Sequence, residues 1–339
     1  MIISFNYILA VLALLPGYLY SQEPQSIKIW DKANHNAFTD IGYFKSYFYC
    51  TFREGISHVP KDTTENGRIR IIRSADLKTW EPVTLLENDR YDLRDPKLSV
   101  TPGKRLMVLM GGSHYVNGKL IDLQPHVSFS SDGTNFTNPV PVVIEKSVQT
   151  KYDWIWRVTW NGRAGFGVVY QSNTPDNRNK VRLLKTTDGI SYNQMTEFNI
   201  ESLPNEATIR FDRDQNMIIL LRREANANGY LGISRPPYIE WKWKTLDYRL
   251  GGPNLIVLKN GKFLIGTRLY LPGSASTVIY RTDREGKIQK TIRLPSGGDT
   301  SYAGLLLFKK HLLVSYYSSH EEKTSVYLAK IRLSDLLKH

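Results

Sequence analysis

Arginine recurs at the ends of strand-like segments along this chain of 339 residues. The residues are Arg53, Arg94, Arg157, the adjacent pair Arg222 and Arg223, and Arg268. A guanidinium group keeps its charge at physiological pH and can bind a carboxylate through two parallel hydrogen bonds. One such arginine is usually a solvated edge residue or half of a structural ion pair. Its return in five successive segments favours an anion-binding clamp.

A carboxylate and a phenol stand at the entry of two later segments. Glu206 lies in segment 204–208 and Tyr302 in segment 299–304, each just before a strand-like run. Among arginines, a carboxylate serves either as a counter-ion or as a base that activates a neighbouring hydroxyl. Both interpretations of Glu206 stay open at this point.

A repeated phrase shows which elements position these residues. Segments 74–80, 130–136 and 186–192 each contain an Asp turn and close on an aromatic residue. The closing residues stand at 80, 136 and 192, so both intervals are 56 residues. Repeats of several strands per unit at such intervals are typical of a β-propeller. We expect the three aspartates to bind the backbone of their own turns and to have no catalytic role.

The remaining strand-like runs extend this pattern over the whole chain. They are separated by Gly, Asn, Asp and Pro turns, and only residues 333–337 suggest a short helical turn. Six units are expected, beginning near Gly42, Pro96, Trp154, Glu206, Pro253 and Tyr302. Segment 26–30 is available as the outer strand of the short sixth unit. The sequence therefore predicts an all-β, six-bladed β-propeller as a single domain spanning residues 22–339.

The amino-acid composition and net charge indicate which class of molecule the protein binds. The formal net charge is +13, hydrophobic residues make up 41% and aromatic residues 12% of the chain. These values favour a strand-rich globular protein with an acidic partner. Because Lys and Arg are dispersed between strands and form no runs, an acidic oligosaccharide or glycoconjugate is favoured over nucleic acid.

The first 21 residues have the character of a secretory signal peptide. Residues 8–16 are almost wholly apolar and are too short a run for a full membrane span. No cysteine stands directly after this run. The chain has a single cysteine, Cys50, so an internal disulfide is precluded, and Cys50 is expected to be a buried structural thiol. We expect a periplasmic or secreted protein without an integral membrane span in the mature chain.

No cofactor or metal is expected. The seven histidines show no spacing typical of zinc, and no Asp-rich calcium loop is visible. Phosphate-binding loops and dinucleotide-binding motifs are likewise missing from the sequence.

In the order of these residues the chain resembles the sialidase superfamily, whose members are six-bladed propellers. Arg53 ends the opening strand, Glu206 precedes Arg222 and Arg223, and Arg268 precedes Tyr302. The resemblance implies that the arginines hold a substrate carboxylate, that Tyr302 is the nucleophile and that Glu206 takes its proton. It further implies a retaining exo-glycosidase that removes a terminal acidic sugar, an exception to the two-carboxylate rule of glycosidases.

The aspartate that serves such enzymes as acid and base has no single counterpart here. The loop after the first strand offers His58 and Asp62, and Asp95 beside Arg94 is a third candidate. Two alternatives to hydrolysis also stay open. A polysaccharide lyase acting on uronates could use His58, His320 or Tyr302 to move a proton, and a glycan-binding propeller would keep the arginines without catalysis.

Overall fold

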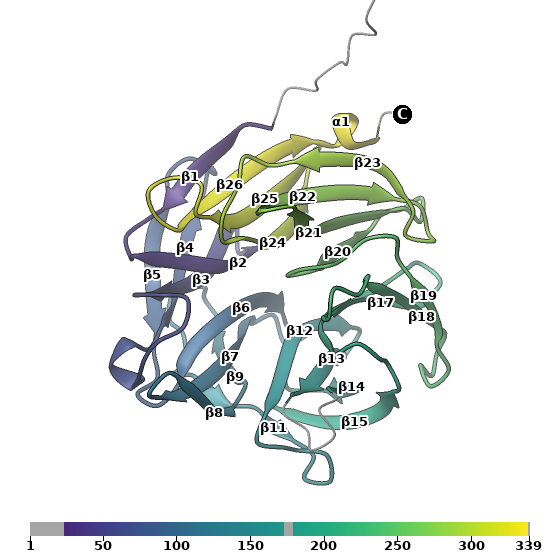
Figure 1. The fold of residues 1–339 in the computed structure, drawn as a ribbon, viewed down its shortest axis with the longest axis horizontal. Helices are drawn as coiled ribbons and strands as arrows, with labels where there is room; N and C mark the ends of the chain where they lie inside the picture. The colour runs from purple at the N-terminus through teal and green to yellow at the C-terminus, as the bar shows by residue number, and fades with distance from the viewer. Residues whose placement is uncertain (1–23, 173–178, 338–339) are drawn as a thin grey trace, which may run out of the picture.

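The computed structural model describes residues 24–172 and 179–337, and in it six β-sheets surround a common axis (Figure 1). The predicted six-bladed β-propeller is therefore confirmed. The expected signal peptide at residues 1–21 lies outside the described residues. Within the described ranges, no helix has the length and apolar character needed to cross a membrane.

Each blade runs from an inner strand at the axis to an outer strand at the rim. Blade 1 contains β2 (His35–Phe44), β3 (Tyr47–Gly55), β4 (Arg68–Ser74) and β5 (Glu81–Leu86). Blade 2 contains β6 (Asp92–Val100), β7 (Leu106–Val116), β9 (His126–Ser130) and β10 (Val140–Pro141), with β8 (Lys119–Leu123) also paired to β7. Blade 3 contains β12 (Asp153–Asn161), β13 (Ala164–Gln171), β14 (Lys180–Thr186), β15 (Ser191–Phe198) and β11 (Val143–Ile144).

The second half of the chain forms three four-stranded blades. Blade 4 contains β16 (Pro204–Phe211), β17 (Met217–Arg223), β18 (Tyr230–Ser234) and β19 (Lys242–Thr245). Blade 5 contains β20 (Asn254–Val257), β21 (Phe263–Leu271), β22 (Ser274–Thr282) and β23 (Ile288–Arg293). Blade 6 contains β24 (Thr300–Phe308), β25 (His311–Ser318), β26 (Ser325–Arg332) and β1 (Ser26–Trp30).

The strand β1 closes the ring as expected. It pairs antiparallel with β26, with Ser26 opposite Ala329, and so supplies the outer strand of blade 6. Blade 1 begins at His35, earlier than the expected Gly42, whereas the other blades begin within a few residues of their expected positions. Two short helices complete the described structure, the 3-10 turn η1 (Thr63–Glu65) and α1 (Leu333–Leu337).

The Asp turns are structural, in agreement with the expectation from sequence. The carboxylate of Asp132 accepts hydrogen bonds from the backbone N–H groups of Thr134 and Asn135, both at 2.8 Å. These bonds hold the pKa of Asp132 below its usual range. Asp76 and Asp188 bind their own turns in the same way.

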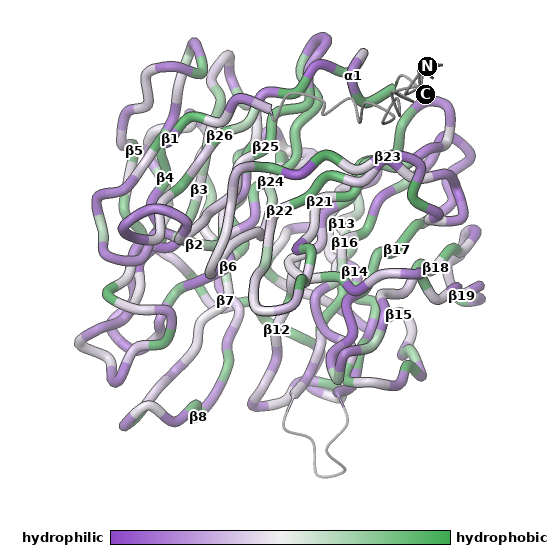
Figure 2. The backbone as a smooth tube through the Cα atoms, turned by 45° about the horizontal axis from the view of Figure 1, so that its top comes forward, coloured by the Kyte–Doolittle hydropathy of each residue, from purple (hydrophilic) through white to green (hydrophobic). Residues whose placement is uncertain are grey.

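Apolar side chains fill the space between neighbouring blades. Figure 2 shows hydrophobic stretches along the strands and hydrophilic residues at many of the connecting turns. Cys50 is fully buried in this packing, and burial raises the pKa of its thiol. It is the structural thiol that the sequence suggested.

Candidate active site

Five of the six inner strands carry a β-bulge close to their first residues. The pairing register shifts between Ala37 and Asp40, Arg94 and Lys97, Ile155 and Val158, Pro204 and Ala207, and Ser301 and Gly304. The shifted segments contain Phe38, Asp95, Trp156, Glu206 and Tyr302, one from each blade except blade 5. A bulge redirects a side chain out of the regular alternation of its strand and is often found beside active sites.

The central contact of this group joins Tyr302 to Glu206. The Tyr302 hydroxyl donates to the Glu206 carboxylate at 2.6 Å, and the Arg222 guanidinium lies 2.9 Å from the same carboxylate oxygen. Arg222 also contacts the Tyr302 hydroxyl at 3.4 Å and pairs with Glu224 at 2.7 Å. A phenol, a carboxylate and a guanidinium therefore share one network.

A glycine makes this contact possible. Tyr302 and Glu206 come from blades 6 and 4, and blade 5 between them presents Gly252, whose φ is 59°. A Cβ atom at Gly252 would lie 2.7 Å from the Tyr302 ring. The backbone N–H of Gly252 donates to the second oxygen of Glu206 at 2.8 Å. The absent side chain thus leaves room for the ring, and the backbone holds the carboxylate.

The protonation states of the pair follow from their surroundings. Burial acts to raise the pKa of Glu206, but Arg222 and the hydrogen bond from Tyr302 outweigh it and leave that pKa below its usual range. Burial, with the charge of Glu206 added, raises the pKa of Tyr302 well above its usual range. The resting state is therefore a neutral phenol that donates to an ionised carboxylate.

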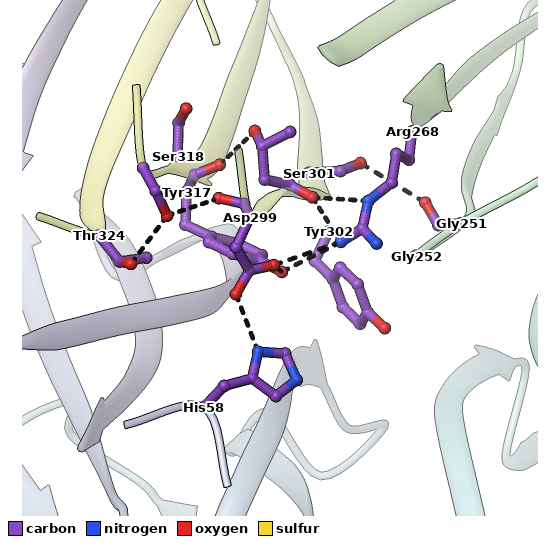
Figure 3. A network of polar contacts seen from close by, with 12 residues as sticks. His58, Gly251, Gly252, Arg268, Asp299, Ser301, Tyr302, Tyr317, Ser318 and Thr324 are labelled. Carbon is purple, nitrogen blue, oxygen red and sulfur yellow. Dashed lines mark hydrogen bonds and ion pairs between the residues drawn. The ribbon is translucent and has the colours of Figure 1, made fainter. Parts of the chain in front are cut away.

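A second network around Tyr302 joins Arg268 of blade 5 to residues of blade 6 (Figure 3). Arg268 donates from Nε and from one terminal nitrogen to the carbonyl oxygen of Thr300, at 2.9 and 2.6 Å. Its guanidinium carbon lies 5.7 Å from the centre of the Tyr302 ring. Asp299 accepts a hydrogen bond from the Tyr317 hydroxyl at 2.8 Å and lies 3.6 Å from Arg268. Arg222 and Arg268 therefore both contact the nucleophile candidate.

His58 and Asp95, two of the three candidate acids, lie in the central group. His58 is half exposed, with Nδ1 2.8 Å from Asp299, and its ring packs edge-on against Phe38 at 5.2 Å. Asp95 has a φ of 51° and is partly buried, and burial raises its pKa despite the nearby charge of Arg94. Arg94 donates to the backbone carbonyl of His58 at 3.2 Å and lies 4.9 Å from the Phe38 ring centre.

Three predicted clamp arginines are bound elsewhere. Arg53 is fully buried against Asp92, with contacts of 2.9 and 2.6 Å, and Arg157 forms a two-bonded pair with Asp40 at 2.8 and 3.1 Å. Arg223 donates to the Asn228 carbonyl and stacks on Tyr230. Arg222 is thus the member of the adjacent pair that faces Tyr302.

The two remaining candidates also lie apart from Tyr302. Asp62 caps η1 by accepting a hydrogen bond from the backbone of Thr64, and its side chain is solvent-exposed. His320 contacts Ser318 and packs against the Tyr327 ring. Neither residue has a contact with Tyr302, Glu206 or Arg222 among the described interactions.

The comparisons with known proteins establish the fold. No protein-family model matches the chain, and no curated protein sequence matches it. A protein of unknown function from Dyadobacter fermentans superposes with a TM-score of 0.77 at 17% identity, over 92% of this chain and 99% of that one. The Hadza microbial sialidase Hz136 superposes with a TM-score of 0.69 at 13% identity, over 90% of this chain and 67% of that one. The chain has the sialidase-type six-bladed propeller fold.

This sialidase-type propeller is shared by proteins named for a neutral sugar. The α-L-arabinofuranosidase Arb93A from Fusarium graminearum matches with a TM-score of 0.68 at 16% identity, over 94% of this chain and 100% of that one. At such identities the likeness shows the fold and does not transfer a substrate. The chemistry must be argued from the side chains.

Several residues around Tyr302 and Glu206 were not predicted from the sequence. Lys97 is buried with its amine 4.3 Å from the centre of the Trp156 ring and 5.9 Å from that of Tyr302. Phe38, Trp156, Gly252 and Asp299 were missed as well. The inward turn of Phe38 and Trp156 depends on bulges, which strand alternation does not reveal. The only available signal for Asp299 was its place three residues before Tyr302.

Proposed function

We propose that this protein is a retaining glycoside hydrolase that removes a terminal acidic sugar from a glycan. The observation that carries the proposal is the 2.6 Å hydrogen bond between the neutral phenol of Tyr302 and the ionised carboxylate of Glu206. Solved structures named as glycosidases share the fold and support the broader class.

The pair is suited to nucleophilic catalysis. As the Tyr302 oxygen attacks the anomeric carbon, its proton passes to Glu206, and Arg222 stabilises the negative charge shared by the two groups. A neutral phenol approaches an anionic sugar without the repulsion that a carboxylate nucleophile would meet. Hydrolysis of the glycosyl-tyrosine intermediate then restores both residues.

The acidic substrate is inferred from the two arginines nearest the nucleophile. The side chains of Arg222 and Arg268 are 14% and 19% exposed, so each retains a surface that a ligand can reach. A substrate carboxylate placed between them would be bound by two permanent cations. We propose this pair as the clamp, together with Arg94, whose guanidinium carbon lies 4.9 Å from the centre of the Phe38 ring.

One observation favours a neutral sugar as the second candidate. Each predicted clamp arginine already has a carboxylate or carbonyl partner within the protein. A site whose cations are internally neutralised could accept an uncharged sugar such as a terminal arabinofuranoside.

The decisive test is mass spectrometry of the products formed from a panel of oligosaccharides by the protein and by Tyr302→Phe. The panel contains sialosides, other keto-deoxy sugars, uronosides and arabinofuranosides. A released acidic monosaccharide that disappears with the variant is expected. A released neutral sugar would support the second candidate, and an unsaturated product would identify a lyase. Binding without turnover would indicate a glycan-binding propeller. Secretion or periplasmic location remains part of the proposal.

A further inference from the structure

We propose that His58 donates the proton to the leaving group and that Asp299 is the positioning residue that holds its imidazole for this task. This inference rests on the proposed hydrolase function and adds the acid that the function requires. It also gives Asp299, which the sequence analysis had not selected, a defined role.

Two contacts hold the imidazole of His58, and a third holds its backbone. Its Nδ1 lies 2.8 Å from Oδ2 of Asp299, its ring packs edge-on against Phe38, and its backbone carbonyl accepts from Arg94. With the side chain 50% exposed, the opposite nitrogen, Nε2, has no hydrogen-bond partner among the described residues. A fixed ring with one free nitrogen is the arrangement that a general acid requires.

The imidazole of His58 and the side chain of Tyr302 lie in the same part of the site (Figure 3). Phe38 contacts both rings, with centroid distances of 5.2 Å to His58 and 5.1 Å to Tyr302. His58 and Tyr302 therefore pack on the same aromatic ring, and the proposal assigns the leaving glycosidic oxygen to the exposed Nε2 of His58.

Asp299 is suited to hold the ring because it is itself held. Its Oδ1 accepts from the Tyr317 hydroxyl, and its Oδ2 lies 3.2 Å from Nε2 of His35. Burial acts to raise the pKa of Asp299, but the hydrogen bonds to His35 and His58 outweigh it and leave that pKa well below its usual range. An ionised Asp299 can only accept a hydrogen bond, so it holds a proton on Nδ1 of His58 and fixes the orientation of the ring.

The proton balance closes over the two steps. In the first, Tyr302 bonds to the anomeric carbon, its proton passes to Glu206, the glycosidic bond breaks, and imidazolium Nε2–H protonates the leaving oxygen. In the second, water attacks the anomeric carbon and gives a proton to Nε2 of His58, while the tyrosine oxygen leaves and recovers its proton from Glu206.

His35, His58 and Asp299 also resemble a metal-binding set, since their ligand atoms lie within 4.8 Å of one another. A metal-bound histidine usually donates its other ring N–H to a partner. Nδ1 of His35 is buried and has no such partner among the described residues. The contacts therefore favour a hydrogen-bonded acid over a metal site.

Leaving-group dependence tests the role of His58. Nitrophenyl glycosides of the released sugar need little protonation to depart, whereas natural oligosaccharides need it fully. We expect His58→Gln and Asp299→Asn to lower kcat on oligosaccharides by about 10²-fold or more and to change kcat on nitrophenyl glycosides far less. Asp122→Asn is the matched control, because Asp122 also accepts from a histidine, His114, at 2.9 Å on blade 2.

The histidine tautomers give a readout that does not depend on turnover. In ¹⁵N spectra of the neutral ring, the signals removed by His58→Gln identify His58. We expect a protonated Nδ1 in the natural protein and in Asp122→Asn, and a shift toward the Nε2-protonated form in Asp299→Asn. An unchanged tautomer in Asp299→Asn would overturn the positioning role.

The other outcomes are equally distinct. Equal losses on both substrate classes in His58→Gln would exclude His58 as the acid, and a leaving-group-dependent loss in Asp95→Asn alone would assign that role to Asp95. Loss of activity after dialysis against a chelator would replace the dyad with a metal site. If no glycoside is cleaved by the natural protein, the hydrolase proposal and the acid role fail together, while the tautomer experiment still decides whether Asp299 orients His58.

Discussion

Tyr302 and Glu206 meet at 2.6 Å although the blades that carry them are not neighbours. The inner strand of the intervening blade begins after Gly252, which has no side chain to separate them. Arg222 and the backbone of Gly252 hold the carboxylate at its two oxygens. The chemistry proposed for this protein depends on that arrangement.

Replacing Tyr302 by Phe removes one hydroxyl and keeps the ring that packs on Phe38 and Trp156. We expect turnover to fall below detection while the affinity for the released sugar, measured by calorimetry, stays within a few-fold. Tyr248→Phe serves as the control, because the Tyr248 hydroxyl donates to the Gly286 carbonyl and has no other hydrogen bond among the described residues. Full activity in Tyr302→Phe would exclude this residue as the nucleophile.

Gly252→Ala tests whether the Tyr302–Glu206 contact needs the space left by the missing side chain of Gly252. The new methyl group would lie 2.7 Å from the Tyr302 ring, so we expect the Tyr302–Glu206 bond to be disrupted and kcat to fall at least tenfold. Gly273→Ala is the matched control, because Gly273 also has a positive φ, 68°, but nothing within 4 Å of an added Cβ. Both variants should lose roughly 1 kcal/mol of stability from backbone strain. Similar activity in the two would show that the contact is not required.

The clamp can be tested with two adjacent arginines. Arg222 faces Glu206 and Tyr302. Arg223 instead stacks on Tyr230, with its guanidinium carbon 3.7 Å from the centre of the Tyr230 ring. We expect Arg222→Gln to weaken binding of acidic sugars by tenfold or more, and Arg223→Gln to change it little. Arg268→Ala should weaken acidic sugars far more than neutral ones in the same calorimetric assay. Equal losses for both kinds of sugar would make Arg268 a structural residue.

Lys97 predicts a pH-dependent stability. Burial lowers the pKa of its amine from 10.5 to about 8, so the unfolded chain binds more protons than the folded chain between these values. The buried charge of Lys97 therefore lowers the free energy of unfolding. This destabilisation is complete below pH 8 and decreases as the pH rises toward 10.5.

Lys97→Met should accordingly stabilise the protein at pH 7 by about 1 to 2 kcal/mol, after allowing for the lost contact with Trp156, and by much less at pH 10. Denaturant unfolding at both pH values measures this difference. Lys244→Met, at a half-exposed surface lysine, should change stability by no more than about 0.5 kcal/mol at either pH. A gain independent of pH would show that the charge of Lys97 is not the cause.

The fold could be predicted because its signal is local and repeated. The Asp turns and their aromatic residues mark strand ends at regular intervals, and the three aspartates bind the turns that contain them. The site could be predicted only in part. Tyr302, Glu206 and Arg268 stand at recognisable strand ends, but the choice between Arg222 and Arg223 depends on which face of β17 turns toward the axis.

Asp299 could not be selected from the sequence for a different reason. Its histidine partners, His58 and His35, are 241 and 264 residues away along the chain, and closure of the ring brings them together. Arg53 shows the reverse case. Its strand-end position suggested a ligand contact, yet Asp92 on the next blade binds its guanidinium in the interior.

The pairing of β1 with β26 has a consequence for synthesis. Blade 6 carries Tyr302 on β24, and its sheet lacks an outer strand until β26 can pair with β1. A nascent chain that has been synthesised through blade 4 already contains Glu206 and Arg222, but it does not yet contain Tyr302. Contacts between segments so distant in sequence tend to form late. The protein is therefore expected to acquire the Tyr302–Glu206 pair at the end of folding, so that partly made chains lack the pair to which the proposed hydrolysis is assigned.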